Sequence, residues 1–236
     1  MSEPKSGAAP RASGARRYSS TLRTEQAAET RRRVISAASE LFARQGYAGT
    51  TMAQIAQAAQ VSPETVQLHG PKAALLQACV EVASLGAEGT TNLLDTDFGA
   101  GYRDAESLED FARHAARVSR GLNERIGGVW RALRVAAATD AQLAERWRQM
   151  MDSIQGSLRS TLAIAAERGW LRDDVGEDEL VASVAVAIDA ESHRLLVEAF
   201  GFGPEQYEDW LARRLYEIVT GRRWSDVEET ASTART

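Results

Sequence analysis

Apolar residues recur every three or four positions along most of this chain, a spacing typical of helices that bury one face. The first such segment, residues 33–47, ends near Gly46, a residue that favours a helix C-terminus. A further segment, residues 71–85, repeats the pattern with Leu75, Leu76, Cys79 and Val82 on its inner face. No run alternates apolar and polar residues as a half-buried strand would. The sequence therefore predicts an all-α fold.

Two short helices are predicted between these segments. Thr51 and Gln54 have the spacing of a capping box, which favours a helix start at Thr50 or Thr51. A second start follows at Ser62 and Pro63, a polar cap and a proline at the first helical position. Since little more than Val61 separates the two helices, they must cross steeply, as in a helix-turn-helix. Val61 and Val66 are expected to face inward, and the opposite face, with residues 64, 65 and 67–69, is free to enter a DNA major groove.

The remainder of the chain also reads as helical. Starts are expected at Ser107, at Asp140 and near Glu177. Asp189 interrupts the apolar run of residues 180–188 and is expected to cap a new helical start that continues to Phe200. Gly127 and Gly128 are expected to precede or loosen a further helix, which carries Val129, Trp130, Leu133 and Ala136. A last helix is predicted over residues 205–219, and residues 87–106 are expected to be a loop that joins two domains.

Four blocks in the first 76 residues resemble the TetR family of transcriptional regulators: the helix from Ile35 to Tyr47, TTMAQIA at 50–56, VSPETV at 61–66, and Lys72. The resemblance implies an N-terminal three-helix helix-turn-helix domain and a larger C-terminal helical domain for ligand binding and dimerisation. The DNA-binding residues that we predict are Thr50, Thr51, Gln54, Pro63, Glu64, Thr65, Gln67, Leu68, His69 and Lys72. We expect domains at residues 24–86 and 87–222, with disordered ends at 1–23 and 223–236.

The C-terminal part also resembles that of some TetR-family proteins, through RALRVAAATDAQLAERW and a closing helix that contains Tyr207–Leu211. The resemblance implies a pocket for a small lipophilic inducer, and the predicted ligand-binding residues are Phe111, His114, Trp130, Trp147, Met150 and Met151. It also implies a homodimer formed by two long helices, whose apolar residues exceed what one helix layer can hide. The predicted dimerisation residues are Leu180, Val184, Ile188, Trp210, Leu211, Leu215 and Ile218.

The sequence departs from the family pattern at the end of the second short helix. Gln67 stands where the family usually has Tyr, and one aromatic residue is missing between His69 and Gly70. Gln67 can hydrogen-bond a phosphate, pair with adenine, or be a solvated surface amide. The same departure leaves open an alternative function, a helical ligand- or partner-binding regulator that has lost tight DNA binding.

Charge is distributed unevenly along the chain. The net charge is −5, but residues 1–86 carry +4 and the remainder −9. The basic first 23 residues could lie along a phosphate backbone, or be a tail without a role. Cys79, the single cysteine, is more consistent with a core residue than with a redox sensor, and it fits a reducing cytoplasm.

Enzymatic chemistry has little support in this sequence. Only three histidines are present, and no Gly-rich phosphate loop, metal-ligand spacing or catalytic triad can be assembled. No apolar run is long enough for a membrane span, and we expect no cofactor. The sequence therefore predicts a cytoplasmic, dimeric repressor that binds a near-palindromic operator in double-stranded DNA and leaves it when an inducer binds.

Overall fold

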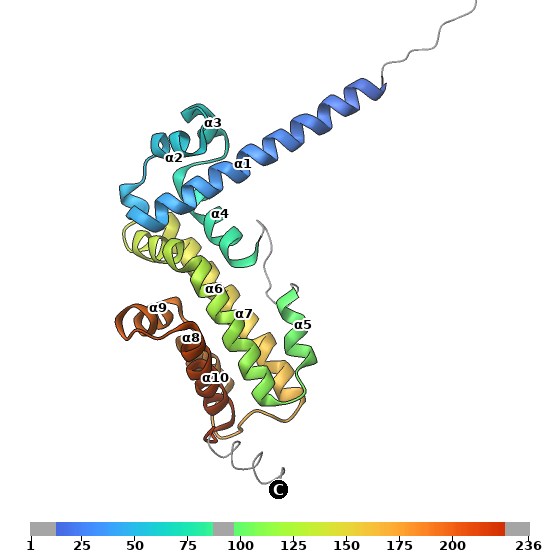
Figure 1. Ribbon diagram of the computed structural model, residues 1–236, viewed down its shortest axis with the longest axis vertical. Coiled ribbons are helices and arrows are strands. Elements are labelled where there is room, and N and C mark those ends of the chain that lie inside the picture. Colours follow the sequence, from blue (N-terminus) through green and yellow to red (C-terminus); the bar gives the residue numbers. More distant parts are fainter. Residues whose placement is uncertain (1–12, 87–96, 225–236) are drawn as a thin grey trace, which may run out of the picture.

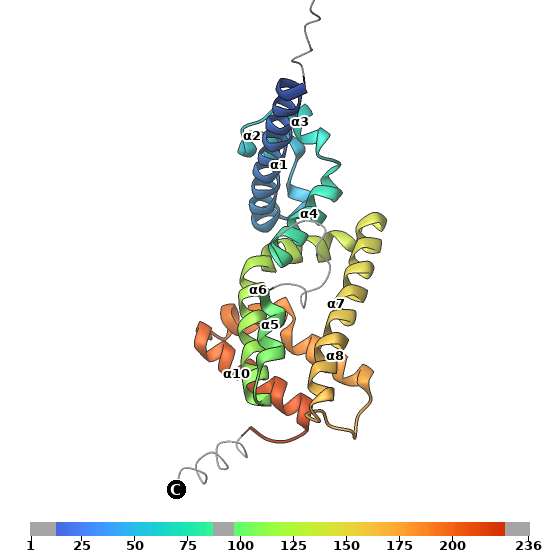
Figure 2. The same ribbon diagram turned by 90° about the vertical axis from the view of Figure 1, so that its right-hand side faces the viewer.

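The computed structural model describes residues 13–86 and 97–224, and these form helices without any strand (Figure 1). The predicted all-α fold, with an N-terminal helix-turn-helix domain and a larger helical domain, is confirmed. The two parts are stacked end to end, so the molecule is elongated (Figure 2).

The N-terminal part consists of four helices. Helix α1 (Ser13–Gly49) is followed by α2 (Met52–Ala59), α3 (Pro63–Leu68) and α4 (Lys72–Leu85). Gly46 has a φ of 72°, which closes the regular part of α1 where the sequence predicts it. The capping box at Thr51 and Gln54 is present, and Ser62 accepts a hydrogen bond from the Thr65 backbone N–H at 3.2 Å.

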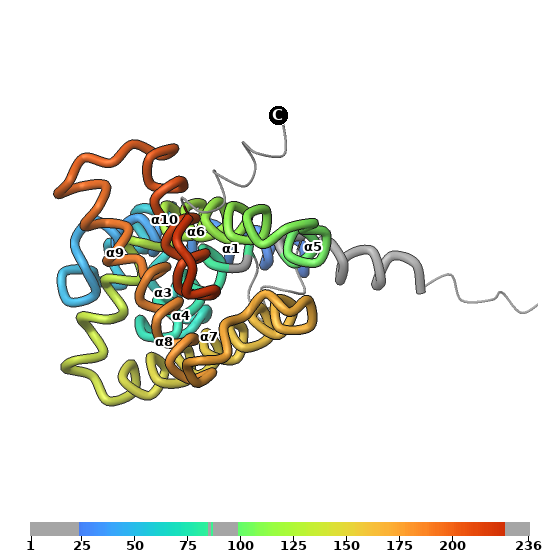
Figure 3. The backbone as a smooth tube through the Cα atoms, turned by 90° about the horizontal axis from the view of Figure 1, so that it is seen from below, coloured from blue at the N-terminus to red at the C-terminus, as the bar shows by residue number. Residues whose placement is uncertain are grey.

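The C-terminal part is built around two long helices. Helix α5 (Asp97–Asp104) lies beside α6 (Leu108–Ala137), as Figure 3 shows, and α7 (Ala141–Glu167) runs back along α6. Helix α8 (Glu177–Ile188), the short α9 (Ala190–Arg194), a π-helical turn (Leu195–Ala199) and α10 (Pro204–Thr220) complete the domain. Asp140 and Asp189 cap α7 and α9, as predicted.

The molecule has two apolar cores, and the first contains residues from both sides of the domain boundary that was expected after residue 86. It combines residues of α1, α2, α3 and α4 with Ile126, Val129, Trp130 and Leu133 of α6. The second core joins α5, the first half of α6, the end of α7, α8 and α10. Helices α1 and α4 therefore pack directly on the middle and end of α6, and the helix-turn-helix reaches the C-terminal part through them.

Several expected boundaries are wrong. Residues 97–104 are helical rather than part of a loop, and α6 continues through Gly127 and Gly128. Helix α1 begins at Ser13, so the backbone of the expected disordered arm is helical from there, while residues 1–12 lie outside the described residues. Trp224 is buried against Tyr216, with ring centroids 5.3 Å apart, so the ordered chain passes residue 223. Residues 225–236 lie outside the described residues.

Candidate functional sites

Helix α3 presents one polar face away from the N-terminal core. Val66 is fully buried, whereas Pro63, Glu64, Gln67 and Leu68 are exposed. Thr65 and His69 are half-buried at the sides of this face. Because the helix has only six residues, its orientation depends on contacts at its two ends.

Two long basic side chains hold the region around α3 in place. The Arg31 guanidinium of α1 donates to the His69 carbonyl oxygen at 3.1 Å, at the C-terminus of α3. The Lys72 ammonium donates to the carbonyl oxygens of Tyr47 and Thr50, at 2.9 and 3.0 Å. It also lies 4.1 Å from the centre of the Tyr47 ring, a cation–π contact. Arg31 thus connects α1 to the C-terminal end of α3, and Lys72 connects the first residue of α4 to the end of α1.

These contacts change the interpretation of two predicted DNA-binding residues. Thr50 is fully buried and its hydroxyl donates to the Gly46 carbonyl oxygen at 2.8 Å, so it cannot reach a DNA groove. Two of the three N–H groups of the Lys72 ammonium donate to backbone carbonyls, so this lysine stabilises the domain, and its phosphate contact stays a prediction. Sequence spacing could not predict this, because the acceptors lie 22 and 25 residues away along the chain.

The predicted residues of α2 lie at its N-terminus. Thr51 and Gln54 are both exposed, but the Gln54 side-chain oxygen accepts the Thr51 backbone N–H at 2.8 Å. Helix α2 therefore offers its capped first turn beside α3.

An apolar cavity of about 500 Å³ lies between α4 and the helices of the C-terminal part. Its walls come from α4, α6, α7 and α8, with a few neutral polar groups such as Ser119, Asn123 and Thr161. Four predicted ligand-binding residues line it: Phe111, Trp130, Met150 and Met151. A cavity of this size and composition suits a small molecule with a large apolar portion.

The other two predicted ligand-binding residues do not line the cavity. The Trp147 ring packs on Trp130, with centroids 4.9 Å apart. His114 packs edge-on against Tyr102 at 4.6 Å, beside α5. The sequence reasoning missed the contribution of α4, through Gln77, Val80, Glu81 and Ser84. No local pattern could reveal it, because it depends on how α4 crosses α6 and α7.

The predicted dimerisation residues are largely internal. Leu180, Val184, Leu211 and Leu215 are buried within their own chain, and Ile188, Trp210 and Ile218 are half-buried against the second core. The four buried residues therefore hold α10 on α6 and α8 on α7 and α10, and they are not a surface for a partner. From α8 to residue 224, the large apolar side chains that remain exposed are Val186 (69%), Phe200 (67%) and Leu195 (48%).

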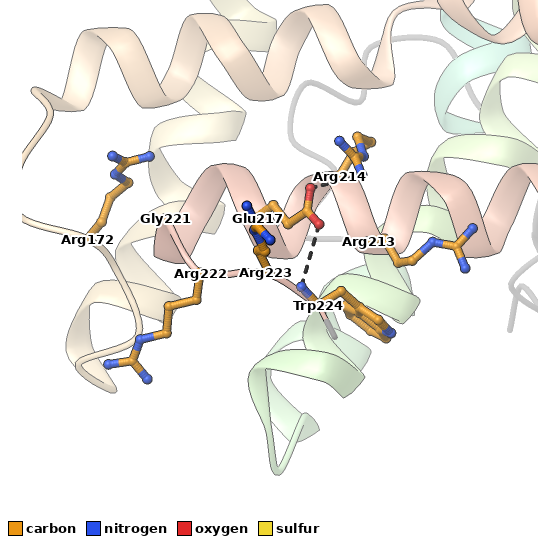
Figure 4. Close-up of a pocket in the computed structure, with 8 residues that line it drawn as sticks. All are labelled: Arg172, Arg213, Arg214, Glu217, Gly221, Arg222, Arg223 and Trp224. Atoms are coloured by element: carbon orange, nitrogen blue, oxygen red, sulfur yellow. Dashed lines mark hydrogen bonds and ion pairs between the residues drawn. The ribbon is translucent and has the colours of Figure 1, made fainter. Parts of the chain in front are cut away.

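A basic surface groove lies at the end of α10, far from α3 (Figures 1 and 4). Arg172 pairs with Asp174 at 2.5 Å, and its backbone N–H donates to the Val219 carbonyl oxygen at 2.9 Å. Arg214 pairs with Glu217 at 3.0 Å, and the remaining cations are Arg213, Arg222 and Arg223. Positive charge near a helix C-terminus is favourable, because the last carbonyl groups of the helix point toward it. The arginines of the groove therefore stabilise the C-terminal end of α10.

Within residues 13–86 and 97–224, no group of three His, Cys, Asp or Glu side chains is arranged to hold a metal ion. None of the helices in this described part has both the length and the apolar character that a bilayer crossing requires.

The exposed face of α3, the helix-turn-helix that carries it and the helical domain beneath define a DNA-binding regulator of the helix-turn-helix class. Residues 34–79 match the family model of bacterial regulatory proteins, tetR family. This match places the N-terminal domain in the TetR family, and the fold of the whole chain is that of TetR-family transcriptional regulators. No curated protein matches the sequence.

Solved structures agree with this assignment at the level of the fold. A transcriptional regulator from Saccharomonospora viridis in complex with choline has a TM-score of 0.65 at 18% identity, over 83% of this chain and 100% of that one. A TetR-family regulator from Mesorhizobium loti has a TM-score of 0.61 at 20% identity, over 81% and 96%. FadR from Bacillus subtilis in complex with stearoyl-CoA has a TM-score of 0.61 at 14% identity, over 81% and 98%.

Proposed function

We propose that this protein is a dimeric transcriptional repressor that a small lipophilic molecule releases from a near-palindromic operator. The observation that carries the proposal is the position of α4. This helix follows α3 directly, packs on α1, and forms one wall of the apolar cavity. A ligand that fits the cavity better in one placement of α4 shifts the population toward that placement, by no more than its difference in affinity.

The DNA-binding part of the proposal rests on the exposed face of α3 and on the way Arg31 and Lys72 fix it. Contacts to phosphates make the affinity depend on salt, and contacts to base edges make it depend on the DNA sequence. Measurements at different salt concentrations and on different sequences therefore distinguish the two kinds of contact. We therefore expect specific binding to the DNA upstream of the protein's own gene, weakening between 50 and 200 mM salt.

The matched variants are Gln67→Ala on α3 and Gln155→Ala on the exposed side of α7. Loss of a base or phosphate contact at Gln67 should lower operator affinity by roughly fivefold or more, while Gln155→Ala leaves it unchanged. Weak, sequence-blind binding that ignores Gln67→Ala would instead favour a helical regulator without tight DNA recognition.

The inducer part of the proposal rests on the 500 Å³ cavity and its apolar lining. Lipophilic molecules that raise the thermal midpoint of the protein should also release it from the operator, because both effects come from the same site. Ala115→Phe, which fills the cavity from α6, should abolish both responses while DNA binding persists. Ala138→Phe, at the exposed end of α6, is the control and should keep both.

The dimer part of the proposal rests on the exposed apolar side chains near α8 and the π-helical turn. Surfaces of this kind on a soluble chain are typical of protein contacts. Sedimentation should give a dimer for the wild type and a monomer for Val186→Glu combined with Phe200→Glu. Val135→Glu, on α6 and 64% exposed, changes a side chain of similar exposure elsewhere and should remain dimeric. A wild-type monomer in solution would contradict this part.

A further inference from the structure

Leu68 is the most exposed large apolar side chain that the structure describes, at 86%. It is the last residue of α3, the helix that the N-terminal core supports from its opposite side through Val66. Leu68 follows Val66 by two residues, which is about 200° around a helix. The Leu68 side chain is therefore directed almost straight away from the protein.

Its neighbours on this face are polar. Glu64 precedes Leu68 by four residues and lies on the same side of the helix, and Gln67 lies next to it. A hydrogen bond with the Ser62 side chain lowers the pKa of the fully exposed Glu64, so its carboxylate stays charged. The Glu64 carboxylate is repelled by phosphates, but it can accept a hydrogen bond from the amino group of a cytosine at the centre of a major groove.

This setting distinguishes Leu68 from the other exposed apolar side chains. Val135, Val186, Leu195 and Phe200 all belong to the C-terminal domain, where several of them lie close together in the chain. Leu68 stands alone among polar groups, so it offers a partner a single apolar contact and no apolar patch. In the DNA major groove, the apolar group that projects from the base pairs is the C5-methyl group of thymine.

We propose that Leu68 is a specificity-determining residue that contacts a thymine methyl group in each half of the operator. This inference rests on the proposed function, since it requires α3 to enter the major groove. The distance from Glu64 to Leu68 along the helix axis is about 6 Å, compared with a base-pair rise of about 3.4 Å. For a helix that lies along the groove, the contacted thymine is about two base pairs from the position that faces Glu64.

The test removes one methyl group at a time from the DNA. An operator is first selected from random sequence with the full-length wild-type protein, and each thymine is then replaced by deoxyuridine, which keeps every hydrogen bond of the base. Affinities are measured by fluorescence anisotropy at one fixed salt concentration. At one position in each half-site, wild-type affinity should fall about fourfold, the value expected for one buried methyl group.

The variants decide whether Leu68 causes this effect. Leu68→Ala should bind the operator more weakly and show no further loss on deoxyuridine replacement at that position, whereas Leu68→Met should keep the sensitivity. Because the side chain is exposed, both variants should unfold at the wild-type temperature.

Three outcomes would overturn the inference, and only the last also overturns the proposed function. If the wild type binds specifically but no thymine methyl matters, or if Leu68→Ala is as sensitive as the wild type, Leu68 does not read thymine and the proposed function stands. If the wild type selects no sequence at all, the proposed function fails together with this inference.

Discussion

At the scale of single residues, Lys72 shows how a side chain that is apparently suited to DNA can serve the fold. Its ammonium donates hydrogen bonds to the carbonyl oxygens of Tyr47 and Thr50, which lie where α1 ends and α2 begins. Hydrogen bonds from a charged donor contribute about 1.5–3 kcal/mol each when buried, and less here because Lys72 is half-exposed.

We therefore expect Lys72→Ala to lower the free energy of unfolding by about 1–2 kcal/mol, measured by urea denaturation. Arg44→Ala, an exposed cation on α1, should change the free energy by less than about 0.5 kcal/mol. A Lys72→Ala variant with wild-type stability and reduced DNA affinity would instead return this lysine to a phosphate contact.

His193 provides a second prediction for a single residue, on pH dependence. Burial lowers the pKa of this imidazole below its usual 6.5, and among its charged neighbours Glu124 and Glu198 raise the pKa while Arg120 lowers it. Between the two pKa values the unfolded chain binds the proton and the folded chain does not, so this contribution to stability is complete above about pH 6.5 and declines as the pH falls.

His193→Gln should therefore reduce the loss of stability between pH 7.5 and pH 5.5, as measured by urea denaturation at both values. The acid-induced loss below pH 5 comes from carboxyl groups and should be the same in both proteins. An unchanged slope between pH 7.5 and 5.5 would show that His193 titrates equally in both states.

At the scale of helices, the crossing of α1 over α6 depends on one glycine. A Cβ atom at Gly128 would lie 2.5 Å from the Ala43 Cβ and 3.1 Å from its Cα, so a larger residue would force the two helices apart. At Gly127, the preceding residue, a Cβ would meet no atom within 4 Å. Of the glycine pair that was expected to precede or loosen a separate helix, Gly128 is thus a requirement of close packing within one continuous helix.

This difference makes a matched pair of variants. Gly128→Ala should destabilise the protein by about 1–3 kcal/mol through overpacking, even though alanine favours the helix. Gly127→Ala should stabilise it by up to about 1 kcal/mol, since only the helix preference changes. Equal effects on the urea midpoint would contradict the close approach of α1 and α6.

At the scale of the whole molecule, the first core makes the helix-turn-helix dependent on the domain below it. Ile126, Val129, Trp130 and Leu133 of α6 belong to the same cluster as Phe42 and the inner residues of α4. A fragment of residues 24–86 would expose the apolar residues that pack on α6, so we expect it to lack a cooperative thermal transition.

The full chain should therefore unfold in one step. All five tryptophans lie after residue 87, and Trp130 alone among them is a buried member of the first core, so their fluorescence reports mainly on the C-terminal part, whereas circular dichroism reports on every helix. The two transitions should coincide in urea. A helical transition that precedes the tryptophan transition would show that the N-terminal domain unfolds independently.

Local sequence determined the features of this protein that depend on three or four neighbouring residues. The starts of α2, α3, α7 and α9 follow from Thr51, Ser62, Asp140 and Asp189, because a cap is completed within one helical turn. The helix-turn-helix follows as well, because the short connection at Val61 allows few crossings.

The tertiary structure decided everything that depends on which helix covers which face. An apolar helix such as α8 or α10 has the same sequence pattern whether it packs on its own chain or on a partner. The burial of Leu211 and Leu215, the acceptors of Lys72 and the share of α4 in the cavity wall all depend on helices distant along the chain. Periodicity gives the face that must be covered, and only the packing of all the helices determines what covers it.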